Sequence, residues 1–387
     1  MCESIQQKLA EAINQNDHEK ATELFFQCVD DLDCDSIDHF LNFVDIETKN
    51  KKNHTALQHI VYVLHKQCGS EKFDVVFDKL IEKGANVNVK NKYSLLYSVS
   101  EFGCIKCVEK LIKAGADVHF KAGDKMNVIS IASRNEHFDI VKVLLDAGAD
   151  PNSTCFKEEQ TPLIEASVCG NVKIISELLS RGANINYRDK RGDAALLFAV
   201  GWNEKDAVEL LLASGADIDI ANNNGVLPIT MALKRRNIDM VKILIKAGAD
   251  VNVTDSNRDN IPMRYIKTIP TNLFMELLNA KNLNINHVNK KNETLLFLAI
   301  KIYPKNHIEK ILKRGADPNF VNKDGDSLLI MAIKGYYRNE SELLIEYGAD
   351  VDYINKKRET ALSLILQKRY FREELAEMIK QRSKHLI

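Results

Sequence analysis

The stretch Asp239-Met-Val-Lys-Ile-Leu-Ile-Lys-Ala-Gly-Ala-Asp-Val-Asn-Val253 predicts a helix, a glycine turn and a short extended segment. Its apolar residues recur at helical spacing as far as Ile245. Gly248 ends the helix because glycine adopts the left-handed backbone conformation at little cost. The same turn, Gly-Ala followed by Asp or Asn, occurs at Gly84, Gly115, Gly148, Gly182, Gly215, Gly248, Gly315 and Gly348.

The spacing of these turns is close to 33 residues. Successive turns are 31, 33, 34, 33, 33, 67 and 33 residues apart, and the step of 67 spans two periods. A fixed period of this length indicates one supersecondary unit repeated many times, in place of a single central core. The length of 387 residues therefore sets the number of repeats.

A second motif, of the Thr-Pro-Leu-His-x-Ala kind, follows most of the turns. Thr161-Pro-Leu-Ile-Glu-Ala166 is a clear copy. Thr or Ser can cap a helix, and Pro at the first helical position forfeits only an N–H that lacks a partner. Each copy therefore predicts a helix start. The openings lie at 55–60, 94–99, 127–132, 161–166, 194–199, 227–232, 261–266, 294–299, 327–332 and 360–365.

With both motifs in register, the chain closely resembles the ankyrin repeat family over about residues 50–387. The resemblance implies an all-α solenoid of about ten to eleven helix pairs with short β-hairpin fingers. It also implies a concave face of fingers and first helices that usually holds another protein. No opening has His at its fourth position, where the family uses His to link neighbouring hairpins. We expect apolar packing to replace that link.

The predicted divisions are an acidic N-terminal capping helix pair (1–53), the repeat array (54–359) and a C-terminal capping repeat (360–387). Caps are expected because the end of a solenoid has no neighbour to cover it. An insertion falls around Lys66–Ser70 in the first clear repeat. The repeat at 260–286 is irregular, since Asn282 replaces the turn glycine and Pro270 is expected to interrupt the first helix early.

Composition argues against several classes of protein. The net charge is −1, with 45% hydrophobic and 28% charged residues, which is ordinary for a folded domain. We expect no membrane insertion and no export signal, because no long apolar run is present. Residues 1–48 carry a balance of −10 and residues 281–387 one of +6. With an acidic N-terminus and basic finger tips only near the other end, nucleic acid is not the expected partner.

The sequence offers no clear catalytic or cofactor motif. The glycines outside the turns form no phosphate-binding or nucleophile motif, and the ten histidines are isolated. We predict no enzyme activity, no cofactor and no metal. Cys104-Ile-Lys-Cys107 is half of a zinc or redox motif, but no second such pair follows, so we expect a structural role. The eight scattered cysteines favour a reducing compartment, and a cluster of Cys, His and Asp formed by folding remains an alternative.

The residues just beyond each opening are predicted to line the concave face. Trp202 is the only Trp in the chain, and large aromatic residues are common anchors of interfaces. The alternative is that Trp202 folds back over its own helix pair. The predicted partner-binding residues of this face are Phe102, Val168, Cys169, Trp202, Lys234, Arg235, Lys301 and Lys334.

The fingers carry a second predicted set of binding residues. Aromatic residues one period apart would stand side by side along the fingers, or would fill gaps between hairpins that lack the usual His. Lys190 and Arg191 form a basic finger tip. The predicted finger residues are Phe120, Tyr187, Lys190, Arg191, Phe320 and Tyr353.

These features predict a monomeric, non-enzymatic adaptor that binds a protein segment with apolar anchors and acidic residues. The alternative is a secreted, host-directed effector or a regulatory protein, in which the N-terminal segment or a hidden Cys/His cluster adds an activity. The expected location is the cytoplasm, or the host cytoplasm for an effector.

Overall fold

The computed structural model describes residues 2–89, 93–121, 126–156, 158–367 and 373–383. The regular secondary structure of these residues is helical, and the predicted all-α fold is confirmed. Within the same residues no strand forms, and the fingers contain only the isolated bridges Lys121–Asn127, Cys155–Gln160 and Val321–Ser327. The fingers are therefore turns and loops more than regular hairpins.

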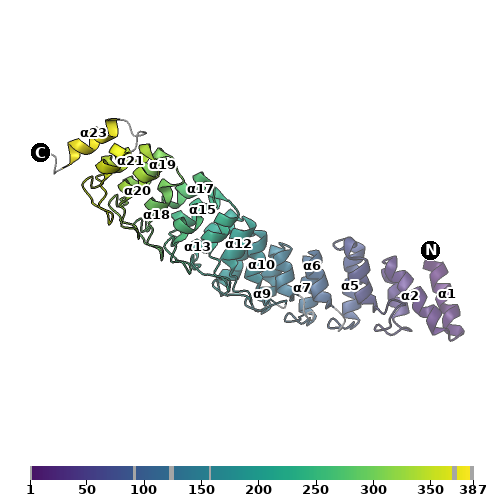
Figure 1. The fold of residues 1–387 in the computed structure, drawn as a ribbon. Coiled ribbons are helices and arrows are strands. Elements are labelled where there is room, and N and C mark those ends of the chain that lie inside the picture. The colour runs from purple at the N-terminus through teal and green to yellow at the C-terminus, as the bar shows by residue number, and fades with distance from the viewer. Residues whose placement is uncertain (1, 90–92, 122–125, 157, 368–372, 384–387) are drawn as a thin grey trace. The chain divides into compact units, whose positions relative to one another are not determined.

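The chain divides into two compact bodies. The N-terminal body is Met1–Asp217 with Ala221–Gly225, and the C-terminal body is Ile218–Ile220 with Val226–Ile387. Figure 1 shows that within each body the helices follow one another as stacked pairs. The structure does not test the predicted divisions at residues 53 and 359, which remain predictions.

The described helices of the N-terminal body begin with three that precede the first clear repeat. Pairs of helices then follow, with a 3-10 turn (η1) in the first pair. Their bounds are α1 (Cys2–Asn14), α2 (His18–Asp30), α3 (Cys34–Phe40), α4 (Ala56–Val63), η1 (His65–Gln67), α5 (Glu71–Glu82), α6 (Leu95–Phe102), α7 (Ile105–Lys113), α8 (Val128–Arg134), α9 (Phe138–Asp146), α10 (Pro162–Cys169), α11 (Val172–Ser180), α12 (Ala195–Trp202) and α13 (Lys205–Ala213).

The described helices of the C-terminal body form five further pairs. Parts of the predicted C-terminal cap, residues 368–372 and 384–387, lie outside the described residues. The bounds are α14 (Pro228–Lys234), α15 (Ile238–Lys246), α16 (Ile261–Tyr265), α17 (Thr271–Leu277), α18 (Leu295–Ile300), α19 (Lys305–Lys313), α20 (Leu328–Lys334), α21 (Arg338–Glu346), α22 (Ala361–Gln367) and α23 (Glu373–Arg382).

Each first helix begins where its opening motif predicts. In α10, the Thr161 side chain accepts a hydrogen bond from the N–H of Ile164, and Pro162 occupies the first helical position. The one shift occurs in α16, where the capping residue is Asn260, one residue before the predicted opening. All eight turn glycines have φ between 85° and 99°, a conformation in which a side chain would be strained.

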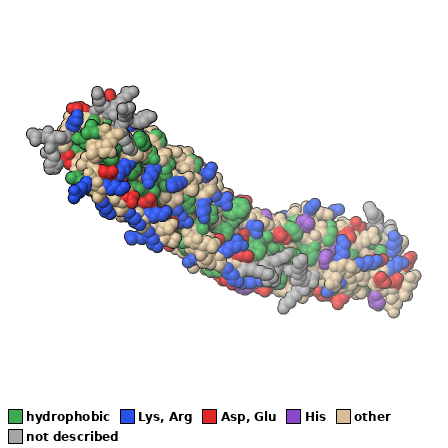
Figure 2. Space-filling model, in the orientation of Figure 1, with side chains coloured by type: hydrophobic (Ala, Val, Ile, Leu, Met, Phe, Trp, Pro, Cys, Tyr) green, Lys and Arg blue, Asp and Glu red, His purple; other side chains and the backbone are tan. Residues whose placement is uncertain are grey.

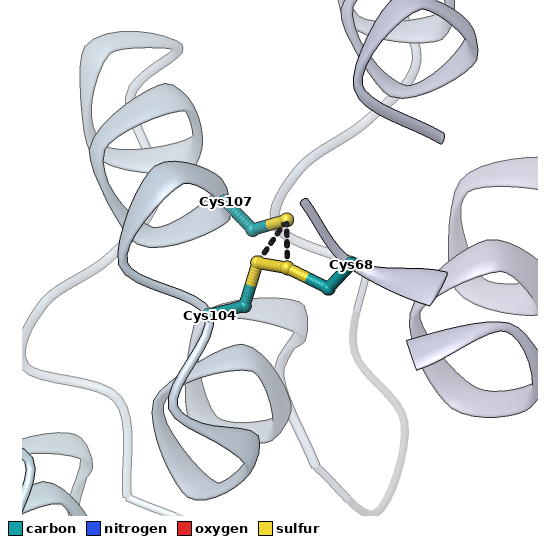
Figure 3. Close-up of side chains that lie close together, drawn as sticks. All are labelled: Cys68, Cys104 and Cys107. Carbon is teal, nitrogen blue, oxygen red and sulfur yellow. Dashed lines mark hydrogen bonds between the residues drawn. A yellow bond between two sulfur atoms is a disulfide. The ribbon is translucent and has the colours of Figure 1, made fainter. Parts of the chain in front are cut away.

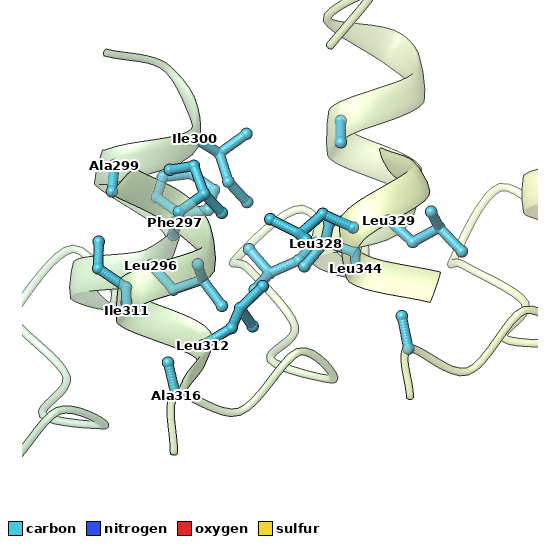
Figure 4. Close-up of a cluster of buried hydrophobic side chains, with 14 of the residues drawn as sticks. Leu296, Phe297, Ala299, Ile300, Ile311, Leu312, Ala316, Leu328, Leu329 and Leu344 are labelled. Carbon is cyan, nitrogen blue, oxygen red and sulfur yellow. The ribbon is translucent and has the colours of Figure 1, made fainter. Parts of the chain in front are cut away.

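Neighbouring helix pairs of the C-terminal body share a hydrophobic core that extends from Met263 to Ile379. Figure 4 shows the core between α18–α19 and α20–α21, where Phe297 and Leu312 face Leu328. Leu328 is 1% exposed and Leu312 is 4% exposed. Because burying one such side chain stabilises the fold by about 1.5–3 kcal/mol, stacking of repeats supplies the main stabilising term.

Side chains of Asn also link one finger to the next. Five asparagines of the described residues form this link, which we call the asparagine ladder: Asn88, Asn152, Asn252, Asn286 and Asn319. Each side-chain amide donates a hydrogen bond to a backbone carbonyl of the following repeat. It also accepts a hydrogen bond from the backbone N–H two residues beyond that carbonyl. Asn252 donates to the Asn282 carbonyl at 2.7 Å and accepts from the Asn284 N–H at 2.7 Å. A repeated polar link therefore joins the fingers, in addition to the apolar packing expected in place of the missing His.

Acidic residues near the N-terminus take part in packing. Asp33 caps α3, and Asp38 accepts from Lys79 of α5 at 2.5 Å. This hydrogen bond from Lys79 holds the pKa of Asp38 below its usual value. Part of the acidic segment at residues 1–48 therefore joins the first helices to the repeat that follows.

The irregular repeat is built differently from the prediction. Helix α16 ends at Tyr265, before Pro270 is reached, and Pro270 is the capping residue of α17. Pro270 therefore begins the second helix and does not interrupt the first. In the asparagine ladder, the carbonyl of Asn282 accepts the hydrogen bond that a turn-glycine carbonyl accepts in the other repeats.

We predict that residues 260–286 exchange amide hydrogens faster than residues 294–316 of the next repeat. Helix α16 has only five residues, so it contains few internal hydrogen bonds that must open together. Hydrogen exchange followed by mass spectrometry would measure this difference. Equal protection of the two repeats would contradict it.

Candidate protein-binding surface

The ends of the first helices in the N-terminal body lie side by side and form a row. The Asn135 amide donates to the Glu101 carbonyl at 2.9 Å, and the Cys169 thiol donates to the Arg134 carbonyl at 3.1 Å. A side chain placed at Gly170 would collide with Glu204, so the loops after α10 and α12 also meet. The row therefore brings together the predicted residues Phe102, Val168, Cys169 and Trp202.

Trp202 is the most exposed member of this row. It is the last residue of α12, and its exposed fraction is 62%. Phe102 is 41% exposed, and its ring stacks on His65 with centroids 4.1 Å apart. Val168 and Cys169 are half-buried. Trp202 is consequently not a core residue in this structure, and the row offers an aromatic surface to solvent.

The predicted basic residues of the C-terminal body differ in their solvent exposure and in their contacts with other side chains. Lys234 and Arg235 are exposed, at the end of α14. Lys301 is exposed with its Nζ 3.8 Å from the ring centroid of Phe297, a cation–π contact. Lys334 is half-buried and pairs with Asp326 at 2.8 Å and with Glu359 at 2.7 Å. Lys334 is therefore already engaged by two carboxylates, and its contact with a partner remains a prediction. Figure 2 shows other Lys and Arg side chains over this body.

The aromatic finger residues are half-buried, not projecting. Phe320 and Tyr353 pack against the hydrophobic core, and the Tyr353 hydroxyl donates to the Gly325 carbonyl at 3.0 Å. Phe120 and Tyr187 are also half-buried. This geometry suits the alternative in which these rings fill the space between fingers.

The basic finger tip at Lys190 and Arg191 is paired within the protein. Lys190 lies 3.1 Å from Glu159, and Arg191 lies 3.3 Å from Glu158. All four side chains are well exposed, so these ion pairs exchange readily with other partners.

Sequence reasoning did not identify the exposed aromatic residue Tyr336. Tyr336 follows α20 and is 59% exposed, close to the value for Trp202. The pattern Gly335-Tyr-Tyr337 could have drawn attention to it, because only one of two adjacent rings can point into the core.

His59 is buried and links the N-terminal helices. Its Nε2 lies 2.6 Å from Asp30 of α2, and its Nδ1 lies 3.0 Å from the Asn50 amide. The side chain borders a pocket of about 600 Å³ that α2 and residues 48–52 also line. Both ring nitrogens are engaged, which favours the structural role predicted for this histidine.

Three cysteines that are distant in sequence meet beside α7. Figure 3 shows the sulfur atoms of Cys68, Cys104 and Cys107 pointing toward one another. Cys68 and Cys104 form a disulfide, and the thiol of Cys107 is buried. The purely structural interpretation of Cys104 and Cys107 is therefore incomplete, because it overlooked Cys68 in the insertion.

A buried carboxyl group lies beneath the row. Glu165 of α10 is 3% exposed, and its Oε2 is 3.9 Å from the Arg134 Nε. Burial raises the pKa of Glu165 to about 7, and the attraction to Arg134 offsets only part of this effect.

Comparisons with known proteins agree with this geometry. Residues 95–189 and 185–255 match the family model of ankyrin repeats in three copies. The chain contains ankyrin repeats. Ankyrin repeats form scaffolds for protein–protein interaction, and the exposed row lies on such repeats.

Several curated proteins are similar to parts of this chain. Ankyrin repeat and KH domain-containing protein mask-1 of Caenorhabditis elegans is 36% identical over 89 residues, 23% of this chain and 3% of that protein. Ankyrin repeat and SOCS box protein 3 of Bos taurus is 31% identical over 164 residues, 32% of this chain and 31% of that protein. Transient receptor potential cation channel subfamily A member 1 of Drosophila melanogaster is 32% identical over 114 residues, 28% of this chain and 10% of that protein.

The similarity covers less than a third of these relatives' lengths. Among the described helices of this chain, none combines the length and apolar character needed to cross a membrane.

Proposed function

We propose that this ankyrin repeat protein is a non-enzymatic adaptor that holds a segment of another protein. The row of the N-terminal body receives apolar anchors of the segment, with Trp202 as the main contact. Exposed Lys234, Arg235 and Lys301 attract its acidic residues.

The observation that carries the proposal is the 62% exposure of the single Trp at the end of a first helix. Exposing a ring of this size to water gives no benefit to the isolated fold, whereas a partner that covers it gains a large contact area. The free cations Lys234 and Arg235 add long-range attraction without competing ion pairs in the part of the chain that the structure describes.

The alternative function is that of a regulator or host-directed effector with an added activity. The cysteine cluster is the observation that favours it. We also propose a cytoplasmic location, or the host cytoplasm for an effector, because five of the described cysteines are free thiols.

Charge reversal tests the proposed partner chemistry. We predict that Lys234→Glu with Arg235→Glu slows association with the captured partner at least several-fold and flattens its dependence on salt. Charges at the rim of an interface act mainly on the association rate. Affinity capture with the wild-type chain, followed by stopped-flow or surface-binding kinetics at several salt concentrations, gives the measurement.

The matched control reverses two exposed lysines, Lys242 and Lys246, on the second helix of the same repeat. This variant carries the same change in net charge, so it should bind like the wild type. Equal association rates for both double variants would contradict an acidic partner segment at this surface.

A further inference from the structure

The three sulfur atoms beside α7 form a compact set of soft ligands. Cys104 is the capping residue of α7, Cys107 lies in its first turn, and Cys68 follows η1 in the insertion. The Cys107 Sγ is 2.8 Å from that of Cys104 and 3.7 Å from that of Cys68. All three potential ligand atoms lie within 4.8 Å of one another (Figure 3).

A disulfide alone does not account for the third sulfur. The Cys68–Cys104 bond uses two cysteines and leaves Cys107 as a thiol with 1% exposure. A metal ion, in contrast, deprotonates a coordinated thiol and uses all three sulfurs.

The spacing of the sulfurs suits zinc. Zinc–sulfur bonds of about 2.3 Å in a tetrahedral site place sulfur atoms about 3.8 Å apart. The Cys68–Cys107 separation of 3.7 Å already has this value. The Cys104–Cys107 separation of 2.8 Å is shorter, so after reduction the Cys104 side chain must rotate away from both other sulfurs. Cys68 can adjust as well, because Gly69, with φ of 87°, follows it in an exposed loop.

A fourth ligand is available from the same loop. His65 precedes Cys68 by three residues, so His65-x-x-Cys68 pairs with Cys104-x-x-Cys107 in the spacing of structural zinc sites. The His65 ring stacks on Phe102, and its Nδ1 is buried without a hydrogen-bond partner among the described atoms. Its nitrogens lie outside the 4.8 Å group, so coordination requires the ring to rotate away from Phe102.

Nearby charges are balanced. Lys106 and Lys110 are the nearby cations, and Asp74 and Asp78 are the nearby carboxylates. They pair with each other, Lys106 with Asp74 at 2.9 Å and Lys110 with Asp78 at 2.9 Å. Three thiolates, a neutral imidazole and Zn²⁺ carry one net negative charge.

We propose that the reduced chain binds one Zn²⁺ through Cys68, Cys104, Cys107 and His65, and that this ion fixes the insertion to α7. A dithiol reductant supplies two electrons and two protons to the Cys68–Cys104 bond and becomes a disulfide itself. Binding of Zn²⁺ then releases three protons from the three thiols. Oxidation by a disulfide re-forms the Cys68–Cys104 bond and releases the metal.

Titration of the reduced full-length chain with Co²⁺, followed by displacement with Zn²⁺, tests the proposal. We expect one equivalent of Co²⁺ to give thiolate-to-cobalt absorption and the intense visible bands of a tetrahedral site. Cys68→Ser, Cys104→Ser and Cys107→Ser should each lose this spectrum, and His65→Ala should bind at least tenfold more weakly. Cys34→Ser and Cys169→Ser are matched controls that should keep it.

Alkylation provides a second measurement that does not depend on variants. Zn²⁺ should protect Cys68 of the reduced wild type from iodoacetamide, as read by peptide mass spectrometry, and should leave Cys34 reactive, since both are only half-buried. Absence of thiolate-to-cobalt absorption in the reduced wild type, or an unchanged spectrum in Cys107→Ser, would overturn the site. An unchanged affinity in His65→Ala would overturn the assignment of the fourth ligand.

Discussion

Glu165→Gln is expected to stabilise the protein at pH 8.5 by roughly 3 kcal/mol more than it does at pH 4. Burial raises the pKa of Glu165 from 4.5 to about 7 in the folded chain. Between these values the folded state binds the proton more tightly than the unfolded state. The stabilisation that comes from protonated Glu165 is therefore complete below pH 4.5 and is lost as pH rises through 7. Each unit of the shift corresponds to about 1.4 kcal/mol, and Gln removes the ionisation.

Urea unfolding of the wild type and of Glu165→Gln at pH 4 and pH 8.5 measures this effect. Glu109→Gln is the matched control, because Glu109 is an exposed carboxylate of α7. It should change stability equally at both pH values. If Glu165→Gln behaved like this control, the carboxyl group of Glu165 would not be held protonated by burial.

Trp202→Ala is expected to weaken binding of the captured partner about thirtyfold. Truncating a central aromatic anchor costs about 2 kcal/mol or more of binding free energy, which corresponds to this factor. Because the side chain is 62% exposed in the free protein, its removal should change the free energy of unfolding by less than about 1 kcal/mol. Binding isotherms and thermal melts of the same variant separate the two effects.

The single Trp also reports on binding directly. Its emission in the free protein should resemble that of a solvated indole and should shift to shorter wavelength when the partner covers it. Phe43→Ala is the control, since Phe43 is a 53% exposed aromatic residue outside the row. A large drop in melting temperature for Trp202→Ala, with binding unchanged, would make Trp202 a packing residue.

The fold was predictable because its determinants are local. The glycine turns and capped openings each act within one repeat, and all eight turn glycines adopt the left-handed conformation. Pro270 was misassigned because a proline is compatible with either the end of one helix or the start of the next. Only the actual end of α16 at Tyr265 decides between them.

The candidate site was less predictable because it depends on neighbours in other repeats. Lys334 was predicted to face a partner, and the sequence does not show that Asp326, before it in the chain, and Glu359, after it, both pair with it. Cys68 lies 36 residues before Cys104, in an insertion that has no counterpart in the other repeats. A period of 33 residues identifies equivalent positions, but it cannot show which inserted or substituted side chains meet.

The asparagine ladder has a consequence for how such a chain can evolve. Each link needs one Asn in a repeat, while the next repeat contributes only backbone, so the link does not depend on the next repeat's side chains. Even the irregular repeat accepts it through the carbonyl of Asn282. A duplicated or exchanged repeat that keeps its Asn can therefore join any successor without matched mutations. The binding residues are then free to diverge from copy to copy while the array lengthens.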